Sequence, residues 1–239
     1  MKTIIKTIFA IVIFLSVTSC MFDGEIGNRD VQSKKRNISS DFIKIDAANG
    51  LDVILTYGED PSVVVEADEN LHEIIITEVK DGTLHIYTEK NIRTAAAKII
   101  YVSASNINEI EASSGADLIS ENIIDTSELK ISASSGSDIE LRVDVTDLRS
   151  NASSGADIKL VGTATNLDVS ASSGSDIKAY GLKVSNCKAK ATSGADIKLN
   201  VIEKIDAKAT SGADVKYKGN PKIVQHDESS AGDIMNQDG

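Results

Sequence analysis

The chain has 239 residues, of which 36 are acidic and 25 basic, so its net charge is −11 at neutral pH. This acidic excess argues against nucleic acid as a partner, because phosphate groups require a basic surface, and against docking on anionic lipid. Only two cysteines are present, and the three histidines lie apart from them in the sequence. The chain therefore has no cysteine and histidine cluster of the metal-binding kind.

The first residues have the organisation of an export signal. Lys2 and Lys6 form a basic region, and the apolar segment at residues 8–17 is too short to span a membrane. Small residues then precede Cys20, which resembles the lipobox of bacterial lipoproteins, where the cysteine is lipidated. We predict a signal peptide over residues 1–19, acyl chains on Cys20 that attach the protein to a membrane, and a mature net charge of −13 from 23 basic and 36 acidic residues.

The mature chain divides into a tether and one folded body. Residues 20–40 are polar and lack periodicity, so we expect a tether between the lipid and the fold. Residues 41–239 are expected to form a single domain, because a continuous repeat array does not split into independent domains. Within it we distinguish an N-terminal β-region at 41–111, repeats at 112–219 and a C-terminal cap or tail at 220–239.

The N-terminal β-region contains one degenerate coil and a hairpin. The segment IKIDAANGLDVIL, which begins at Ile43, aligns with a later repeat and makes Asp52 an early copy of a recurring aspartate. Asp81 and Gly82 separate the strand-like segments EIIITEVK and TLHIYTE, which is a hairpin signal. We predict that this region caps or interrupts the stack that follows, because open solenoid ends aggregate.

A Ser-Gly-Asp phrase recurs through the rest of the chain at intervals of 18 to 21 residues. Its aspartates are Asp117, Asp138, Asp157, Asp176, Asp196 and Asp214. A degenerate copy places Asp233 another 19 residues on. A period near twenty residues predicts a solenoid.

Apolar and polar residues alternate within each copy. Between Leu129 and Leu141, the leucines, isoleucines and alanine share one parity, and the lysine, aspartate and glutamate share the other. A period of two predicts extended strands with one buried face, and no helical periodicity fits inside the repeat. We therefore predict an all-β fold, a parallel β-helix with about 19–20 residues per coil.

The Ser-Ser-Gly part of the phrase is interpreted as a corner. We expect Ala133, Ser135 and Ser137 to point inward, where the wall bends and room is short. An outward glycine supplies the conformational freedom that the corner needs; these glycines are Gly115, Gly136, Gly155, Gly174, Gly194 and Gly212. Cys187 occupies an inward position, so we expect a small buried hydrophobe and not a nucleophile.

Each recurring aspartate and the residue two positions later are both predicted to point outward. Stacking places the six aspartates in one stripe beside a stripe of lysines, which offsets their repulsion; the lysines are Lys159, Lys178, Lys198 and Lys216. We interpret the aspartate stripe as structural or as an interaction surface. We expect no metal site, because Ca²⁺ takes 6–8 oxygen ligands and each coil offers one carboxylate.

The chain resembles the auto-transporter adhesin family defined by the head GIN domain. The resemblance is carried by FIKIDAANGLDVIL, by the TEVKDGTLHIY hairpin and by the SSGAD coils from Ser113 to Asp214. It covers residues 40–235 and implies a right-handed β-helix on an envelope-anchored protein. It brings no catalytic residues and no specific activity with it.

Three classes of function can be compared. An enzyme is disfavoured because the aspartates follow the fold period, and His72, His85 and His226 all lie outside the repeats; we predict no catalytic residues and no cofactor. Glycan binding lacks the usual aromatic platforms, since the chain has no tryptophan. We favour a non-enzymatic, lipid-anchored outer-membrane protein, at the cell surface or on the periplasmic face, that binds an unidentified protein or glycan. A β-helix that binds or degrades polysaccharide is the alternative.

Overall fold

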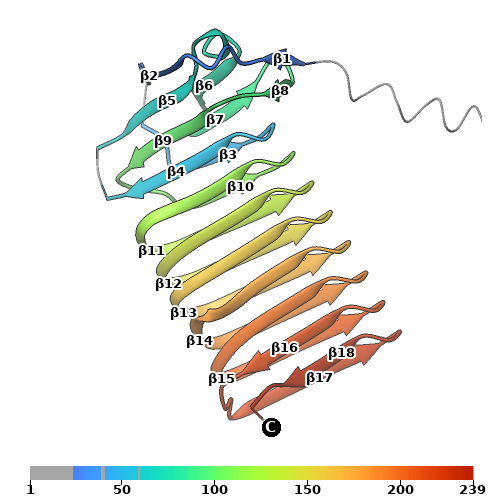
Figure 1. Ribbon diagram of the computed structural model, residues 1–239. Helices are drawn as coiled ribbons and strands as arrows, with labels where there is room; N and C mark the ends of the chain where they lie inside the picture. The colour runs from blue at the N-terminus through green and yellow to red at the C-terminus, as the bar shows by residue number, and fades with distance from the viewer. Residues whose placement is uncertain (1–23, 39–40, 59, 239) are drawn as a thin grey trace, which may run out of the picture.

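The computed structural model describes residues 24–38, 41–58 and 60–238, which form an almost entirely β-sheet solenoid of about seven turns (Figure 1). The predicted parallel β-helix is confirmed. Its coils are built from β10 (Glu109–Ala112), β11 (Asp117–Ser134), β12 (Asp138–Ser153), β13 (Asp157–Ser172), β14 (Asp176–Thr192), β15 (Asp196–Thr210), β16 (Asp214–Lys218), β17 (Ile223–Ser229) and β18 (Asp233–Asn236).

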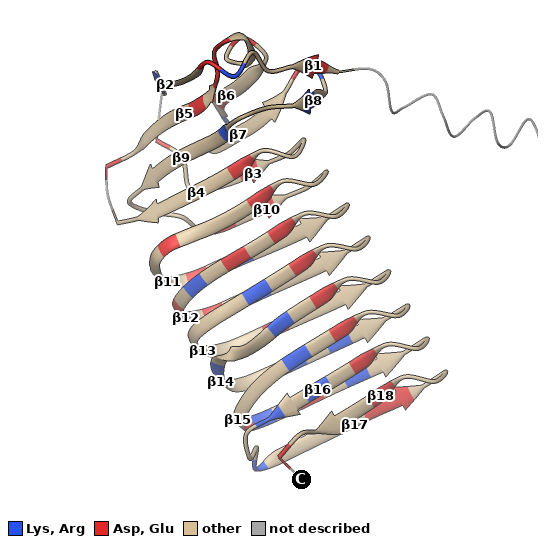
Figure 2. Cartoon of the chain, viewed as in Figure 1, with Lys and Arg blue, Asp and Glu red and all other residues tan. Residues whose placement is uncertain are grey.

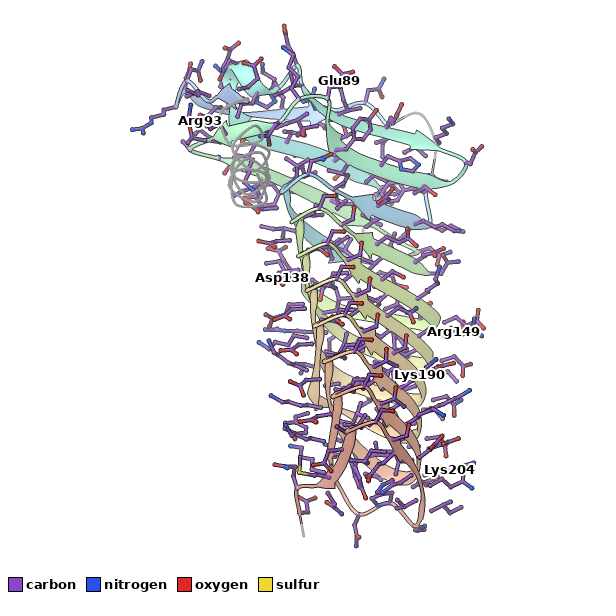
Figure 3. All side chains as sticks on the ribbon, turned by 90° about the vertical axis from the view of Figure 1, so that its right-hand side faces the viewer. Glu89, Arg93, Asp138, Arg149, Lys190 and Lys204 are labelled. Atoms are coloured by element: carbon purple, nitrogen blue, oxygen red, sulfur yellow. The ribbon has the colours of Figure 1, made fainter. Side chains whose placement is uncertain are left out.

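Each long strand runs along one side of the solenoid, bends, and returns along the other. In β12 the alternation of buried and exposed residues breaks at Thr146 and Asp147, which are both exposed, and this marks the bend. We call the side that starts with the recurring aspartate the front face and the side after the bend the back face. Figure 3 shows Asp138 and Arg149 on these opposite sides.

A two-residue turn joins the back face of one coil to the front face of the next. At the end of β12, Ser154 has φ +55° and Gly155 has φ +71°, and the Ala156 N–H donates a hydrogen bond to the Ser153 carbonyl at 3.2 Å. Two successive residues at positive φ, closed in this way, form a type I′ turn. The six corner glycines all lie in this turn, with φ between +67° and +73°.

The expectation that Ser135 points inward is wrong. Ser135 and Gly136 are the two central residues of the turn and are exposed, because the type I′ geometry interrupts the alternation for two residues. Ser137 is buried as expected, and its hydroxyl donates a hydrogen bond to the Ala112 carbonyl of the neighbouring coil at 2.9 Å. The corner is therefore a turn that faces solvent, followed by one small buried residue.

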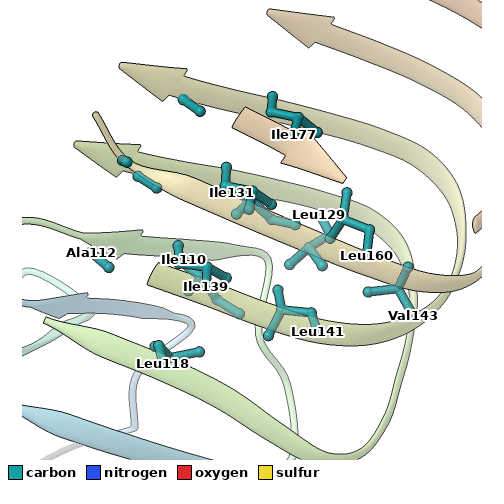
Figure 4. Close-up of a cluster of buried hydrophobic side chains, with 14 of the residues drawn as sticks. Ile110, Ala112, Leu118, Leu129, Ile131, Ile139, Leu141, Val143, Leu160 and Ile177 are labelled. Atoms are coloured by element: carbon teal, nitrogen blue, oxygen red, sulfur yellow. The ribbon is translucent and has the colours of Figure 1, made fainter. Parts of the chain in front are cut away.

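The coils stack in register, so that equivalent residues lie above one another. Ile139, Ile158 and Ile177 pair across successive coils, and such inward columns fill the core (Figure 4). Cys187 is buried in line with Leu167 and Ile205. Burial raises the pKa of its thiol, so this cysteine is an inert core residue.

The N-terminal region both interrupts the solenoid and covers its end. Its elements are β1 (Glu25–Ile26), β2 (Val31–Arg36), β3 (Lys44–Ala47), β4 (Asp52–Tyr57), β5 (Ser62–Asp68), a 3₁₀ turn (Glu69–Leu71), β6 (Ile75–Lys80), β7 (Thr83–Thr88), β8 (Ile92–Thr94) and β9 (Lys98–Ala104).

In this cap, β3 and β4 form the first coil, and β7 and β9 continue its two faces as parallel neighbours. β6 then pairs antiparallel with β7, and β5 pairs antiparallel with β9. Asp81 and Gly82 form the predicted hairpin between β6 and β7, at φ +51° and +75°.

The predicted tether does not hold for residues 24–38, which contain β1 and β2. Pairing of β2 with β5 anchors this segment, and so does the fully buried carboxylate of Asp68. Asp68 accepts hydrogen bonds from the backbone N–H groups of Arg29 at 2.9 Å and of Ala96 and Ala97 at 3.0 Å. Gly27 is required beside it, since a Cβ there would lie 1.9 Å from Oδ2 of Asp68.

At the other end, β17 and β18 form a last coil that pairs with β15 and β16. Positions that point inward in earlier coils here carry His226 and Glu228. The His226 ring packs edge-on against Tyr217, 5.6 Å between centroids, and Glu228 accepts a hydrogen bond from the Ile234 N–H at 3.0 Å. Polar residues thus replace the apolar column where the stack meets solvent.

The alternation predicts opposite tolerances at two adjacent positions of β13. Ile158→Asp places an unpaired charge in the core and should destabilise the fold by more than about 4 kcal/mol. Lys159→Asp changes an exposed side chain and should cost less than about 1 kcal/mol, although it removes the ion pair with Glu140. Thermal and urea unfolding of both variants checks this; similar losses in the two would contradict the assignment of faces.

The buried carboxylate of Asp68 leads us to predict that acid destabilises the N-terminal cap. Burial alone would raise the pKa of this carboxyl, but the N–H donors of Arg29, Ala97 and Ala96 hold it below its ordinary value. Its ionised form therefore stabilises the fold above the unfolded pKa, and this contribution disappears as the pH falls through the folded pKa. Asp68→Asn should lower the free energy of unfolding by about 2–4 kcal/mol at pH 7, and it should reduce the further loss of stability on acidification. The exposed control Asp125→Asn should change neither this free energy nor its pH dependence. Equal curves of unfolding free energy against pH for the two variants would contradict this account.

Candidate interaction surfaces

The predicted lipid attachment site, Cys20, and the signal peptide lie outside the residues that the structure describes. No helix within the described segments is long and apolar enough to cross a bilayer. The recurring aspartates lie on the front face of the solenoid, and the corner glycines lie in the turns. Both broad faces carry outward columns that run along the solenoid axis.

The front face carries the recurring aspartates in one column, beside a column of lysines (Figure 2). The register aligns all six predicted aspartates and extends the column to Asp52 and Asp233. Lys178 contacts Asp157 at 2.6 Å and Asp176 at 3.8 Å, and Lys216 contacts Asp214 at 3.0 Å. Lysines therefore pair with three of the recurring aspartates in the C-terminal half of this face, Asp157, Asp176 and Asp214.

The N-terminal part of the front face lacks these lysines. The column that holds them further along carries Ile119, Ile54 and Tyr101 here, and Ile119 and Tyr101 are 44% and 37% exposed. Burial and the charges of Asp138 and Asp52 raise the pKa of Asp117. This region is an apolar surface bordered by carboxylates, of which Asp52 pairs with Lys98 at 3.4 Å.

The back face carries three outward columns, which we name by their place between the bend and the turn. The bend column is Glu128, Asp147, Asn166, Asn186 and Lys204. The middle column is Lys44, Glu109, Lys130, Arg149, Asp168, Lys188 and Asp206. The turn column is Ser132, Asn151, Ser170, Lys190, Lys208 and Asp227. A shallow groove of about 780 Å³ lies between the bend and middle columns.

Hydrogen bonds link some of these side chains from coil to coil. Asn186 donates to Asn166 at 3.1 Å, and Asn166 donates to Asp147 at 2.8 Å. Glu109 accepts hydrogen bonds from Lys130 and from Lys44, and these two lysines lower its pKa to about 2. Glu109 thereby joins the first coil to the coils beyond the insertion.

The C-terminal part of the middle column is different, because its charges alternate without pairing. Arg149, Asp168, Lys188 and Asp206 come from consecutive coils and are all exposed. Within the described chain, no ion pair or side-chain hydrogen bond is formed by any of the four. Sequence reasoning missed this column, although the residue directly after each buried leucine, cysteine or isoleucine at this position of the repeat identifies it.

The chemistry-bearing residues do not converge on one point. His72 is buried and its Nε2 lies 3.0 Å from the Gln32 carbonyl, burial being the main cause of its lowered pKa. His85 lies 3.0 Å from Asp46, and His226 lies in the last coil. Among the described residues, no group of three or more histidine, cysteine, aspartate or glutamate side chains is arranged to hold a metal ion.

Comparison with known protein families assigns the chain to one of them. The family model described as "Putative auto-transporter adhesin, head GIN domain" matches residues 41–221, and the chain belongs to this family. The predicted resemblance is therefore confirmed. No curated protein matches the sequence.

Solved structures share the fold. A protein described as a putative adhesin from Bacteroides fragilis aligns with a TM-score of 0.83 at 24% identity, covering 89% of this chain and 100% of that one. One described as a putative lipid binding protein from Parabacteroides distasonis gives a TM-score of 0.73 at 18% identity, covering 88% of this chain and 99% of that one. A further protein, described as a putative adhesin from Parabacteroides merdae, gives a TM-score of 0.69 at 21% identity, covering 90% of this chain and 99% of that one. The family and these neighbours are described as adhesins or lipid-binding proteins and not as enzymes, and the adhesin description fits a protein of the cell envelope or surface.

Proposed function

We propose that the protein is a non-enzymatic adhesin that acyl chains on Cys20 anchor to the outer membrane, with the solenoid at the cell surface. The observation that carries this proposal is the continuity of its outward columns. Equivalent side chains line up over successive coils on both faces, so the molecule offers long, regular surfaces. Such surfaces suit the binding of another macromolecule better than the conversion of a small substrate.

Physical stability supports a role outside the cell. The backbone of each coil pairs with the coils on either side, and the inward columns form one continuous hydrophobic core. Cys187 is a free, buried cysteine, so this stability does not depend on a disulfide within the described chain. A solenoid of this kind keeps its faces rigid because each coil is fixed by its neighbours.

The anchor is supported by the sequence before the fold. The order of basic residues, apolar core and small residues before Cys20 matches an exported lipoprotein. Cys20 lies only four residues before Gly24, where the described structure begins. The lipid would therefore hold the N-terminal cap close to the membrane and leave the repeat coils to extend away from it.

Polysaccharide binding is the second candidate, and the back-face groove favours it. Asn166, Asn186, Arg149 and Asp168 line this groove, and amide, guanidinium and carboxylate groups can hydrogen-bond sugar hydroxyls. Degradation of the polymer has less support, because no histidine of the described chain lines the groove, and its carboxylates all belong to the repeating columns. Addition of soluble polysaccharide should block adhesion if the groove binds glycan, and should have no effect if the partner is a protein.

The anchor and the surface location can be tested together. In cells that make the wild-type chain, the protein should enter the detergent phase on phase separation, and external protease should remove it from intact cells. Cys20→Ser should remain unprocessed or soluble and should abolish attachment of the cells to their surface or to one another. Cys187→Ser serves as the control, because it changes the buried cysteine and leaves the anchor intact. Wild-type protein that resists external protease would contradict the surface location.

A further inference from the structure

The back face has a charge pattern that is complementary to itself. Its middle column alternates in sign over four consecutive coils, from Arg149 through Asp168 and Lys188 to Asp206. These side chains are exposed and unpaired within the described residues. Alternating charges in line can pair with a second such line only if the two are placed in the right register.

Two copies of the face can be brought together about a two-fold axis that runs parallel to the strands. Each column then lies against the same column of the other copy, with the order of the coils reversed. If the axis passes between the coils of Asp168 and Lys188, Asp168 lies opposite Lys188 of the second copy. In the same register, Arg149 lies opposite Asp206.

The other two columns agree with this register. In the bend column, Asp147 lies opposite Lys204, and Asn166 lies opposite Asn186. In the turn column, Lys190 and Lys208 lie opposite the neutral residues Ser170 and Asn151. The three kinds of ion pair each occur twice by symmetry, and no two like charges oppose each other.

Registers shifted by half a coil lose this match. Moving the axis to the Asp168 coil places Arg149 opposite Lys188 and each Asp168 opposite its own equivalent. Moving it to the Lys188 coil places Asp168 opposite Asp206 and each Lys188 opposite its own equivalent. Of these three antiparallel registers, only the one with its axis between the coils of Asp168 and Lys188 brings no like charges of the middle column together.

We propose that the back face binds the back face of a second copy of this chain, antiparallel, about a two-fold axis between the coils of Asp168 and Lys188. The contact is isologous, as two-fold symmetry requires.

The proposed contact is weak and responds to salt. Six coils at the ~4.8 Å strand spacing and three columns about 13 Å wide give a flat area of about 370 Å² per copy, which lies at the small end for protein interfaces, as expected for a transient complex. Exposed ion pairs are screened by salt. The polar groove between the bend and middle columns is expected to retain bridging water. Strong attachment would then come from many copies acting together.

The antiparallel arrangement determines where the partners can be anchored. It places the two N-terminal caps at opposite ends of the pair. If each cap lies near a membrane, the two copies belong to two facing surfaces, so the contact joins one cell to another. This part of the inference rests on the proposed adhesin function, whereas the pairing itself does not depend on it.

Sedimentation velocity of the detergent-solubilised full chain, in density-matched detergent at low ionic strength, tests the pairing. The wild type should dimerise reversibly and should dissociate in 0.5 M NaCl. Asp168→Lys and Lys188→Asp should each weaken dimerisation at least about tenfold, because each places like charges opposite each other at two positions. An equimolar mixture of the two variants should dimerise again, since lysines at 168 and 188 of one copy then face aspartates of the other.

Matched charge reversals on the front face are the controls. Asp138→Lys and Lys198→Asp change the net charge by the same amounts and should leave dimerisation unchanged. A monomeric wild type at all concentrations, or single variants that dimerise as the wild type does, would overturn the proposal. Protease removal and detergent partition of the wild type report on the adhesin function independently, so failure of one does not imply failure of the other.

Discussion

The type I′ turn at the end of each coil is the constraint on which the rest of this structure depends. Ser154 and Gly155 both adopt positive φ, and the same pair of angles recurs in every described copy, with Asn49 and Gly50 in the first coil and Ser230 and Ala231 in the last. The turn amide also bonds to the next turn, from Gly155 to the Ser173 carbonyl at 3.2 Å. Because a slip of one residue would move every side chain to the opposite face, this stacked turn fixes both the core and the outer columns.

The sequence was sufficient to predict the features that are local and periodic. Alternation identified Ile158 as buried and Lys159 as exposed, and the recurring aspartate identified the front-face column. The turn type was not predicted, so Ser135 was placed inside. The ordered segment at residues 24–38 was missed because its anchor, Asp68, is 28 to 39 residues away from the amides that it binds. The back-face columns were missed because the bends differ in length, with register shifts in β11 and β14.

Repetition also explains why the described chain offers long, continuous surfaces on both faces. A column places one side chain per coil at a constant spacing, and the same residue type then produces a stripe, as with the aspartates of the front face. Catalysis instead requires unlike groups to converge around one reacting atom. Where the repeat departs from identity, the surface acquires specificity: lysines give way to Ile119 and Tyr101 on the front face, and the charges alternate from Arg149 to Asp206 on the back face. The solenoid supplies regularity, and the exceptions distinguish one surface region from another.

The claim that these faces join cells through copies of the same chain is tested most directly by mixing two labelled strains. One strain carries Asp168→Lys and the other Lys188→Asp, each as the only copy of the protein. The account predicts that each strain alone remains dispersed at low ionic strength, while the mixture forms clumps in which both labels occur together. Clumping of either strain alone to the wild-type extent, or a mixture that stays dispersed while wild-type cells clump, would contradict it.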